Sequence, residues 1–217
     1  MRFILSFLLI FSLALPVCAA EHMLAFSTKP YALNDEDKAA LKRIENYLSG
    51  IHTLSAEFTQ AAPNGDISAG KFYLSRPGKL RMEYAPPTPV LMVASGNDIT
   101  YYDKELDQVS HIPLESTLVG FLAQEEVKFD NTVIITNFEH GDKTMRVSLI
   151  QSKRPKDGTL TLEFSDDPLV IRNMVVTDSS GQVTTVSLNN AHFGAPLAAD
   201  LFTFKDPHLG GHRGVDK

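Results

Sequence analysis

Apolar and polar residues alternate with a period of two through residues 70–87. This period is typical of strands that have one apolar and one polar face. Arg76-Pro77-Gly78 divides the stretch, and because proline fixes φ and glycine permits positive φ, these residues predict a strand-joining turn. The sequence therefore predicts a hairpin with an arginine at its turn. The alternating apolar positions of its two strands are Phe72, Leu74, Leu80, Met82 and Tyr84.

Further segments of the strand type follow one another along most of the chain. Asn64-Gly65 is a strong hairpin signal, and turns at Gly96, Gly141 and Gly181 separate later segments. Because no helical crossover divides successive strands, roughly ten strands are expected to form an antiparallel meander. Besides the central hairpin, the predicted strands cover residues 54–59, 90–93, 99–102, 109–112, 132–136, 144–151, 159–164, 170–177 and 182–189.

Two segments have a helical pattern instead. Residues 34–50 begin with Asn34 as a cap and three acidic residues in the first turn, and they end at Gly50. Residues 114–129 also place their apolar positions on one helical face, although Gly120 argues against a single straight helix. The two apolar faces consist of Leu41, Ile44, Leu48 and Ile51, and of Leu114, Leu118, Phe121, Leu122 and Phe129.

The helical faces decide between two ways of arranging the strands. A closed barrel would leave both apolar faces exposed, whereas a half-open one lets them cover its concave side. We therefore expect a mainly β fold, built as a single strongly curved antiparallel sheet (an incomplete β-barrel) that short α-helices cover.

The first twenty residues predict a secretory signal peptide that is cleaved. Arg2 supplies a positive start, residues 3–15 are almost wholly apolar but too short to span a bilayer, and Cys18-Ala19-Ala20 offers a cleavage site. Lipidation of Cys18 is the alternative, but Pro16-Val17 fits that processing poorly. We therefore expect three parts, a leader at 1–20, one domain at 21–206 and a flexible tail at 207–217.

Charge and cysteine content restrict the partners and the compartment. The chain has 20 basic and 26 acidic residues, and loss of the leader would remove only Arg2, which leaves a net charge of −7. This balance argues against nucleic acid or an anionic membrane surface as the main partner. The one cysteine lies in the leader, so we expect the remaining chain to be held together by its core, without disulfides, in an oxidising compartment. We also expect it to be a monomer.

Patterns that carry chemistry are missing from the sequence. It contains neither a GxxxxGK[ST] phosphate loop nor a GxSxG nucleophile elbow. His208 and His212 are four residues apart, but the intervening glycines do not favour a helix, so a metal site is not expected. Glu125-Glu126 and Asp166-Asp167 are adjacent residues that point in different directions and so do not form an acid/base pair. We expect no enzyme, no metal and no cofactor.

Several motifs are weak alone but specific in their order. They are Phe58-Thr59-Gln60, Gly70, Arg76-Pro77, Tyr84, Pro87, Gly96, Tyr102-Asp103 and Leu201-Phe202-Thr203-Phe204. With these residues the chain resembles the LolA family of periplasmic lipoprotein carriers, over nearly all of its length after the leader. The resemblance implies an incomplete barrel with a lid, the periplasm as location, acylated lipoproteins as cargo, the inner-membrane ABC transporter LolCDE as donor and the outer-membrane receptor LolB as acceptor.

The resemblance also implies functional residues. It matches Arg76 to an arginine that holds the lid closed through hydrogen bonds, for which the five donors of a guanidinium are suited. An arginine in a turn is otherwise usually solvated, and apolar strand residues otherwise simply fill a core. The expected lining of the lipid-binding cavity consists of Phe58, Phe72, Leu74, Leu80, Met82, Tyr84, Leu91, Val93, Tyr101, Leu118, Phe121 and Leu122.

The resulting hypothesis is a carrier that holds acyl chains in an apolar cavity and shuttles lipoproteins to the outer membrane. Burial is worth about 0.8 kcal/mol per methylene, so a multiply acylated cargo needs an energy-coupled donor to leave a membrane. The alternatives are a lipid- or stress-sensing regulatory protein on the same fold and a carrier of another lipid. The hypothesis requires an apolar hollow beneath the helices, and it would fail if side chains filled that space and Arg76 lay far from both helices.

Overall fold

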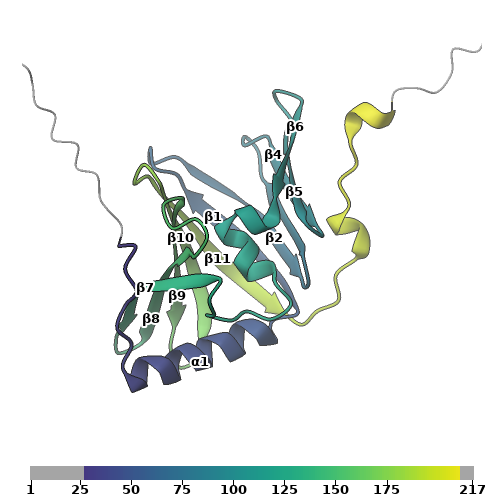
Figure 1. Ribbon diagram of the computed structural model, residues 1–217. Coiled ribbons are helices and arrows are strands. Elements are labelled where there is room, and N and C mark those ends of the chain that lie inside the picture. The colour runs from purple at the N-terminus through teal and green to yellow at the C-terminus, as the bar shows by residue number, and fades with distance from the viewer. Residues whose placement is uncertain (1–26, 211–217) are drawn as a thin grey trace, which may run out of the picture.

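A computed structural model describes residues 27–210 of the chain, and these residues form one antiparallel sheet with one α-helix (Figure 1). The predicted leader at 1–20 lies outside the described residues. The helix α1 spans Asp35–Gly50. The strands are β1 (Thr53–Ala61), β2 (Ile67–Ser75), β3 (Lys79–Tyr84), β4 (Val90–Ser95), β5 (Asp98–Asp103), β6 (Gln108–Pro113), β7 (Val133–His140), β8 (Thr144–Gln151), β9 (Gly158–Ser165), β10 (Val170–Asp178) and β11 (Val183–Phe193).

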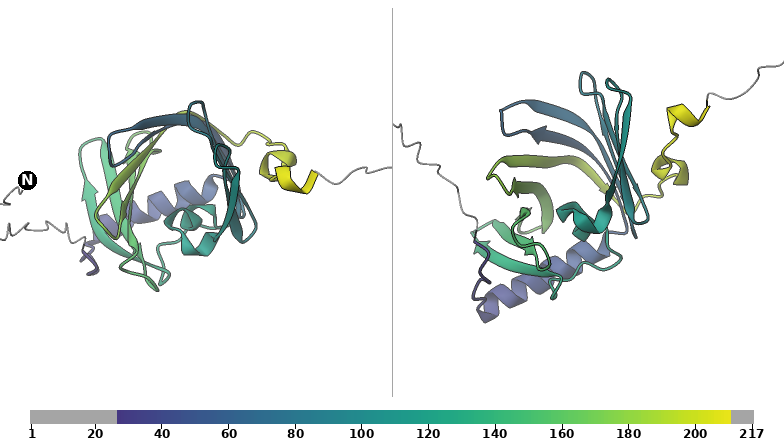
Figure 2. Two further views of the ribbon diagram at one scale, coloured as in Figure 1. Left: turned by 90° about the horizontal axis from the view of Figure 1, so that it is seen from above. Right: turned by 45° about the horizontal axis from the view of Figure 1, so that its top comes forward.

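The sheet has the order β6-β5-β4-β3-β2-β1-β11-β10-β9-β8-β7. Successive strands are neighbours in both halves, and the pairing of β1 with β11 joins the halves. The two outer strands, β6 and β7, do not pair with each other, so the sheet is not closed. Figure 2 shows that it bends so that its two ends lie on either side of the short helices of residues 114–123. The prediction of a single open antiparallel sheet is therefore confirmed.

The first predicted helix is confirmed, and its start follows from local hydrogen bonds. The Asn34 side chain accepts from the Asp37 N–H at 2.8 Å, while the Asp37 carboxylate accepts from the Asn34 N–H at 3.1 Å. This reciprocal cap satisfies two N–H groups that the first helical turn leaves free. The buried face of α1 includes Ile44, and the ring of Tyr47 packs edge-on against Phe164 at 6.2 Å.

The second predicted helix is wrong as an α-helix. Residues 114–129 instead contain two short 3-10 helices, η1 (Leu114–Ser116) and η2 (Leu118–Ala123). The Thr117 hydroxyl accepts from the Gly120 N–H at 3.0 Å and donates to the Leu114 carbonyl at 2.9 Å, which separates the two turns. A Cβ at Gly120 would collide with the Leu114 carbonyl, so the chain folds back on itself more tightly here than a continuous helix allows.

The C-terminal part of the chain crosses the outer side of the sheet. It contains η3 (Ala199–Phe202) and η4 (Pro207–Gly210), and Figure 1 shows it in yellow beside β4 and β5. Phe202 is buried, and Phe204 contacts the ring of Tyr102 at 5.5 Å. The mobility expected for residues 207–217 stays a prediction. Within the described part of the chain, no helix combines the length and apolar character needed to cross a membrane.

An ion-pair cluster attaches the outer side of α1 to the turn between β9 and β10. Arg43 Nη2 donates to Asp166 Oδ1 at 2.7 Å, and His140 Nε2 lies 3.4 Å from Asp166 Oδ2. The hydrogen bond from Arg43 is the main cause that lowers the pKa of Asp166 below its ordinary value. Because the folded pKa is lowered, this carboxylate stabilises the fold above its unfolded pKa and loses that effect as the pH falls through the folded value.

We therefore expect Asp166→Asn to flatten the acid dependence of stability. The thermal midpoint of the parent should fall between about pH 5 and pH 2, and the variant should lose less over the same interval. Asp142→Asn is a suitable control, since Asp142 is exposed and makes no ion pair within residues 27–210. Equal acid dependence in the parent and the Asp166 variant would contradict the assignment.

Candidate functional site

The turn between β2 and β3 connects the sheet to both helical elements. The side chain of Arg76 in this turn forms hydrogen bonds with α1 and η2, and the backbone of the turn forms hydrogen bonds with the same two regions. The Arg76 N–H donates to the His52 carbonyl at 2.9 Å, just after α1, and the Gly78 N–H donates to the Ala123 carbonyl at 2.8 Å, at the end of η2. The hairpin turn predicted from the sequence therefore lies where the two helical elements meet.

The Arg76 guanidinium binds three backbone carbonyls. Nε donates to the Leu122 carbonyl at 2.9 Å, and Nη1 donates to the carbonyls of Leu48 and Ile51, the latter at 2.8 Å. The Leu48 and Ile51 carbonyls lie at the C-terminal end of α1, where the helix dipole is negative and favours a cation. One side chain thus joins the ends of α1 and η2, which agrees with the position expected of a lid latch.

Burial lowers the pKa of the Arg76 guanidinium but does not deprotonate it at neutral pH. Desolvation lowers the pKa of Arg76 to about 10, because no carboxylate compensates the loss of water around it. At neutral pH the group therefore stays protonated and keeps all its donors. A charged group that is half-buried against carbonyls is stable only while those carbonyls stay in place, so the contact depends on the closed position of α1 and η2.

The opposite end of the η1–η2 segment is bound to the other half of the sheet. Gln151 Nε2 donates to the carbonyls of Glu115 at 3.2 Å and Thr117 at 3.1 Å, and Arg154 Nη2 donates to the Glu115 carbonyl at 3.2 Å. The segment therefore spans from the β2–β3 turn to the end of β8. It bridges the open side of the sheet, as Figure 2 shows in the view from above.

Most of the predicted cavity residues share the inner face of the sheet. Strand pairing places Phe72 opposite Met82 and Leu74 opposite Leu80, and paired residues point to the same side. Phe58 lies opposite Gly70 on this face and packs edge-on against Tyr84, with ring centroids 5.0 Å apart. The predicted residues that are buried here or in η2 are Phe58, Phe72, Leu74, Leu80, Met82, Phe121 and Leu122, while Tyr84 and Tyr101 are half-buried.

Leu91 and Val93 are corrections to the predicted lining. Val93 pairs with Arg81 and Leu91 pairs with Glu83, which point to the opposite, outer face of the sheet. The inner-face residues of β4 are Met92, which pairs with Met82, and Ala94. The predicted residue Leu118 belongs to η2, but its side chain lies outside the described residues.

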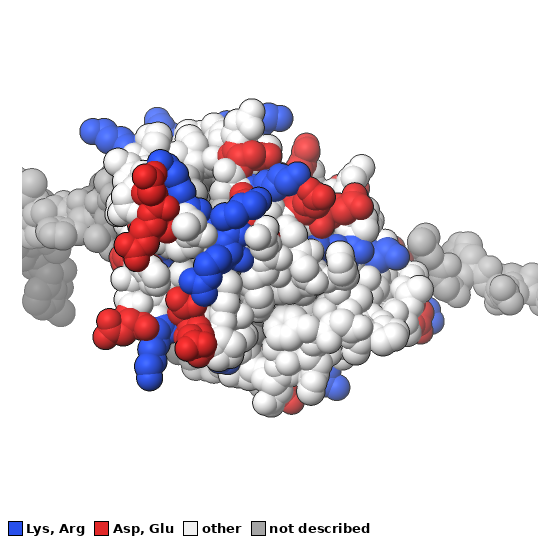
Figure 3. Space-filling model, turned by 90° about the horizontal axis from the view of Figure 1, so that it is seen from below, with Lys and Arg blue, Asp and Glu red and all other residues white. Residues whose placement is uncertain are grey.

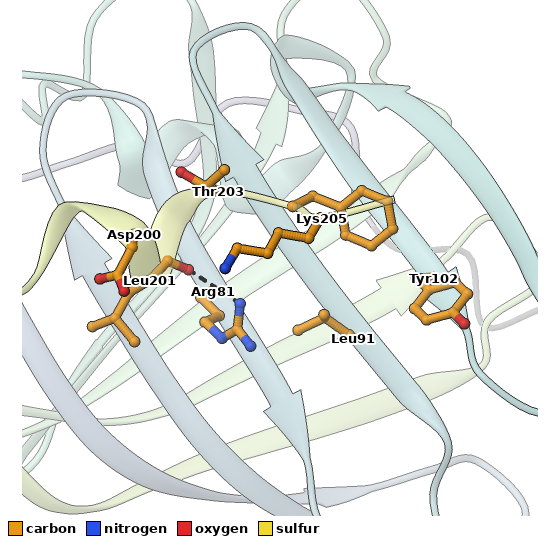
Figure 4. A pocket seen from close by; sticks show the side chains of 8 residues that line it. Arg81, Leu91, Tyr102, Asp200, Leu201, Thr203 and Lys205 are labelled. Carbon is orange, nitrogen blue, oxygen red and sulfur yellow. Dashed lines mark hydrogen bonds between the residues drawn. The ribbon is translucent and has the colours of Figure 1, made fainter. Parts of the chain in front are cut away.

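The outer face at Leu91 forms a pocket of about 330 Å³ beneath the C-terminal segment (Figure 4). Arg81 donates from Nη1 to the Leu201 carbonyl at 3.1 Å and so fastens this segment to β3. Tyr102 lines the pocket from the neighbouring strand, and Lys205 extends over it. Leu91 therefore packs beneath the C-terminal segment, on the side of the sheet away from α1 and η2.

The inner face beneath the helical elements is filled by its own side chains. Solvent reaches 1% of the surface of Phe58 and Leu80, 7% of Met82 and 2% of Leu48 on α1. A second pocket, of about 610 Å³, is lined mainly by polar residues of β7–β10 rather than by this core. The expected open hollow is therefore closed in this structure, whereas Arg76 lies against both helical elements. A carrier would be contradicted by a filled interior together with an Arg76 far from both helical elements. The interior is filled, but Arg76 contacts both elements.

The surface on the α1 side carries charges of both signs. Figure 3 views the molecule from this side and shows Lys and Arg intermixed with Asp and Glu, next to a broad area without charge. On α1, Lys38 pairs with Asp35 at 2.8 Å and Lys42 with Glu45 at 3.0 Å. Paired charges of this kind produce no single-sign field that would attract a polyanion.

Several residues of the site escaped prediction. Met92 and Ala94 were missed because β4 is a continuous apolar run with no period. Gln151 was missed because an amide that binds distant carbonyls leaves no pattern in the sequence.

No group of three metal-binding side chains is present among residues 27–210. The arrangement offers an apolar interior, a bridging segment and an arginine that is hydrogen-bonded to both helical elements.

Comparison with known proteins adds an independent observation. The model of the family described as outer membrane lipoprotein carrier protein LolA matches residues 49–205. The outer-membrane lipoprotein carrier protein of Legionella pneumophila (strain Corby) is 31% identical over 182 residues, which cover 80% of this chain and 86% of the relative. An uncharacterized protein of Rickettsia prowazekii (strain Madrid E) is 25% identical over 183 residues, 84% of this chain and 83% of the relative. The crystal structure of a LolA superfamily protein from Nitrosomonas europaea has 13% identity and a TM-score of 0.45, and the match covers 75% of this chain and 97% of that one.

Proposed function

The chain belongs to the LolA family of outer membrane lipoprotein carrier proteins, whose members are not enzymes, and on that premise we propose that it shuttles acylated lipoproteins through the periplasm. The proposed donor is an inner-membrane LolCDE transporter and the proposed acceptor is an outer-membrane LolB receptor. In this proposal residues 1–20 are removed on export, and residues 21–206 work as a monomeric carrier in the form of an incomplete barrel.

The inner face of the sheet is the proposed binding surface for acyl chains. Its side chains are mostly apolar from β1 to β5, and three of its large side chains are only half-buried, namely Tyr84, Met92 and Tyr101. Each acyl methylene removed from water contributes about 0.8 kcal/mol, so an apolar surface of this kind is needed to hold a lipidated cargo in solution. Because the interior is filled when closed, binding requires that α1 and η2 move away from the sheet.

The observation that supports this proposal most directly is the position of Arg76. A single guanidinium binds carbonyls at the ends of both helical elements, and a hydrogen bond to a charged group contributes about 1.5–3 kcal/mol net. A few such bonds are strong enough to keep the interior closed and weak enough to break when acyl chains replace the side-chain contacts. In this role Arg76 opposes binding and favours release.

Depletion of the protein in its host tests the proposed function. If it is the carrier, outer-membrane lipoproteins should accumulate at the inner membrane, because their acyl chains have no other soluble binding surface. Membrane fractionation followed by detection of a tagged lipoprotein measures the effect, and re-expression of the parent chain should reverse it. Bound lipoprotein should also copurify with the protein from the periplasm. A normal distribution of lipoproteins after depletion would contradict the proposal.

A further inference from the structure

Two side chains of α1 bind the backbone of the segment that follows η2. The Ser49 hydroxyl accepts from the Val127 N–H at 3.1 Å and donates to the Val127 carbonyl at 3.2 Å. One helical turn earlier, Glu45 Oε1 accepts from the Phe129 N–H at 2.7 Å. Since residues four apart lie on the same side of a helix, α1 presents two polar groups to this segment much as a neighbouring strand would.

The segment is packed as well as hydrogen-bonded. Val127 is completely buried, and Phe129 stacks on Phe121 of η2 with ring centroids 5.7 Å apart and planes inclined by 27°. The Glu45 side chain is only 17% exposed, so its bond to an N–H group is charge-assisted and partly shielded from water. The hydrogen bonds of Val127 and Phe129 described above are made to side chains of α1. Their own apolar side chains pack in the same hydrophobic core as the buried residues of η2.

From these contacts we propose that Glu45 and Ser49 are positioning residues that couple α1 to η2, so that both elements leave the sheet as one body. This coupling rests on the proposed carrier function only in one respect, namely that the arrival of acyl chains triggers the movement of α1 and η2. Separation of α1 from the segment would break the bonds that the N–H groups of Val127 and Phe129 donate to Ser49 and Glu45, whereas joint movement keeps these bonds intact.

Coupling also explains how one arginine controls two elements. The Arg76 bonds to Leu48 and Ile51 hold α1, and its bond to Leu122 holds η2. If the two elements moved separately, each would be held by only part of the latch. When they are joined through Glu45 and Ser49, both sets of bonds must break in one step, so opening is all-or-none.

Hydrogen exchange of the ligand-free protein tests the coupling without any cargo. In Glu45→Ala/Ser49→Ala, the amides of Val127 and Phe129 should exchange about tenfold faster than in the parent, because their acceptors are gone. Ser49→Thr keeps a hydroxyl and should restore slow exchange at Val127. Glu36→Ala, which removes a carboxylate from an exposed position of the same helix, is the matched control. Unchanged exchange at both amides in the double variant would overturn the proposal.

Distances between spin labels test the joint movement itself. Cysteines can be introduced at Lys42 on α1, Glu125 after η2 and Ile67 on β2, three exposed positions, since the chain has one cysteine and it lies in the predicted leader. On addition of a tripalmitoylated cysteinyl peptide, the 42–67 and 125–67 distances should change together while the 42–125 distance stays constant. In the double variant the 42–125 distribution should broaden.

The possible results separate this inference from the proposed function. A change of the 42–125 distance in the parent as large as the other two would overturn the coupling. Arg76→Leu releases the latch without ligand, so the same distances can be compared in that variant. If Arg76→Leu moves both labels together but the lipopeptide moves neither, the coupling is supported and the carrier function is contradicted.

Discussion

Arg76→Leu is expected to retain bound acyl chains and to release them at least about tenfold more slowly than the parent. The substitution removes the hydrogen bonds to Leu48, Ile51 and Leu122, and each bond from a charged donor contributes about 1.5–3 kcal/mol. It also leaves those carbonyls without this partner when the interior is closed. The population therefore shifts toward the open, binding-competent state, which raises the apparent affinity for cargo.

Transfer of a fluorescent tripalmitoylated peptide from the protein to acceptor vesicles measures this effect. Arg81→Leu is the matched control, because Arg81 also binds a backbone carbonyl but lies on the outer face, away from α1 and η2. Arg76→Lys keeps a positive charge without the planar fork, and we expect it to fall between leucine and the parent. Release from Arg76→Leu at the parental rate would show that the arginine is not a latch.

Gly70→Ala is expected to destabilise the fold strongly, by about 3 kcal/mol. A Cβ at this position would collide with the Glu83 carbonyl and lie 2.8 Å from the Phe58 ring. The Phe58 ring covers the glycine because Gly70 is its cross-strand partner, and Phe58 also contacts Tyr84. An added methyl group must therefore displace either the β3 backbone or the centre of the apolar interior.

Equilibrium unfolding in urea checks this prediction, with the midpoint and slope compared between variants. Gly50→Ala is the control, because a Cβ at Gly50 meets nothing within 4 Å and alanine favours a helix over glycine. We expect Gly50→Ala to be neutral or slightly stabilising. If Gly70→Ala unfolds at the same urea concentration as Gly50→Ala, the result would contradict the tight packing of the Phe58 ring on Gly70.

The positions of most strands, the first helix and the central turn were predictable because each depends on local rules, whereas the pairing of β1 with β11 was not. Alternation over the central hairpin placed Phe72, Leu74, Leu80 and Met82 on one face, and the pairing of β2 with β3 confirms it. Leu91 and Val93 were assigned to the wrong face because residues 90–94 are all apolar and lack a period. Both faces of β4 are covered, one by the interior and the other by the C-terminal segment (Figure 4).

Residues 114–129 show a second limit of sequence patterns. Their helical spacing of apolar residues identified the side that faces the core, and Phe121 and Leu122 are buried as expected. The pattern did not reveal that the backbone breaks into η1 and η2. The break follows from the close approach of Gly120 to the Leu114 carbonyl and from the anchoring of this segment at both ends by Arg76 and Gln151.

By itself, the sequence determined what neighbouring residues decide, namely the strands, the capped helix and the hairpin turn with Arg76, because alternation, capping and turn chemistry act over a few positions. Only the tertiary structure decided which faces are covered, that the interior is closed, and which carbonyls Arg76 binds. The physical reason is separation along the chain, since Arg76 and Leu122 are 46 residues apart and Ser49 and Val127 are 78 apart. A hydrogen bond across such a distance exists only once the sheet has folded and brought both partners to the same place.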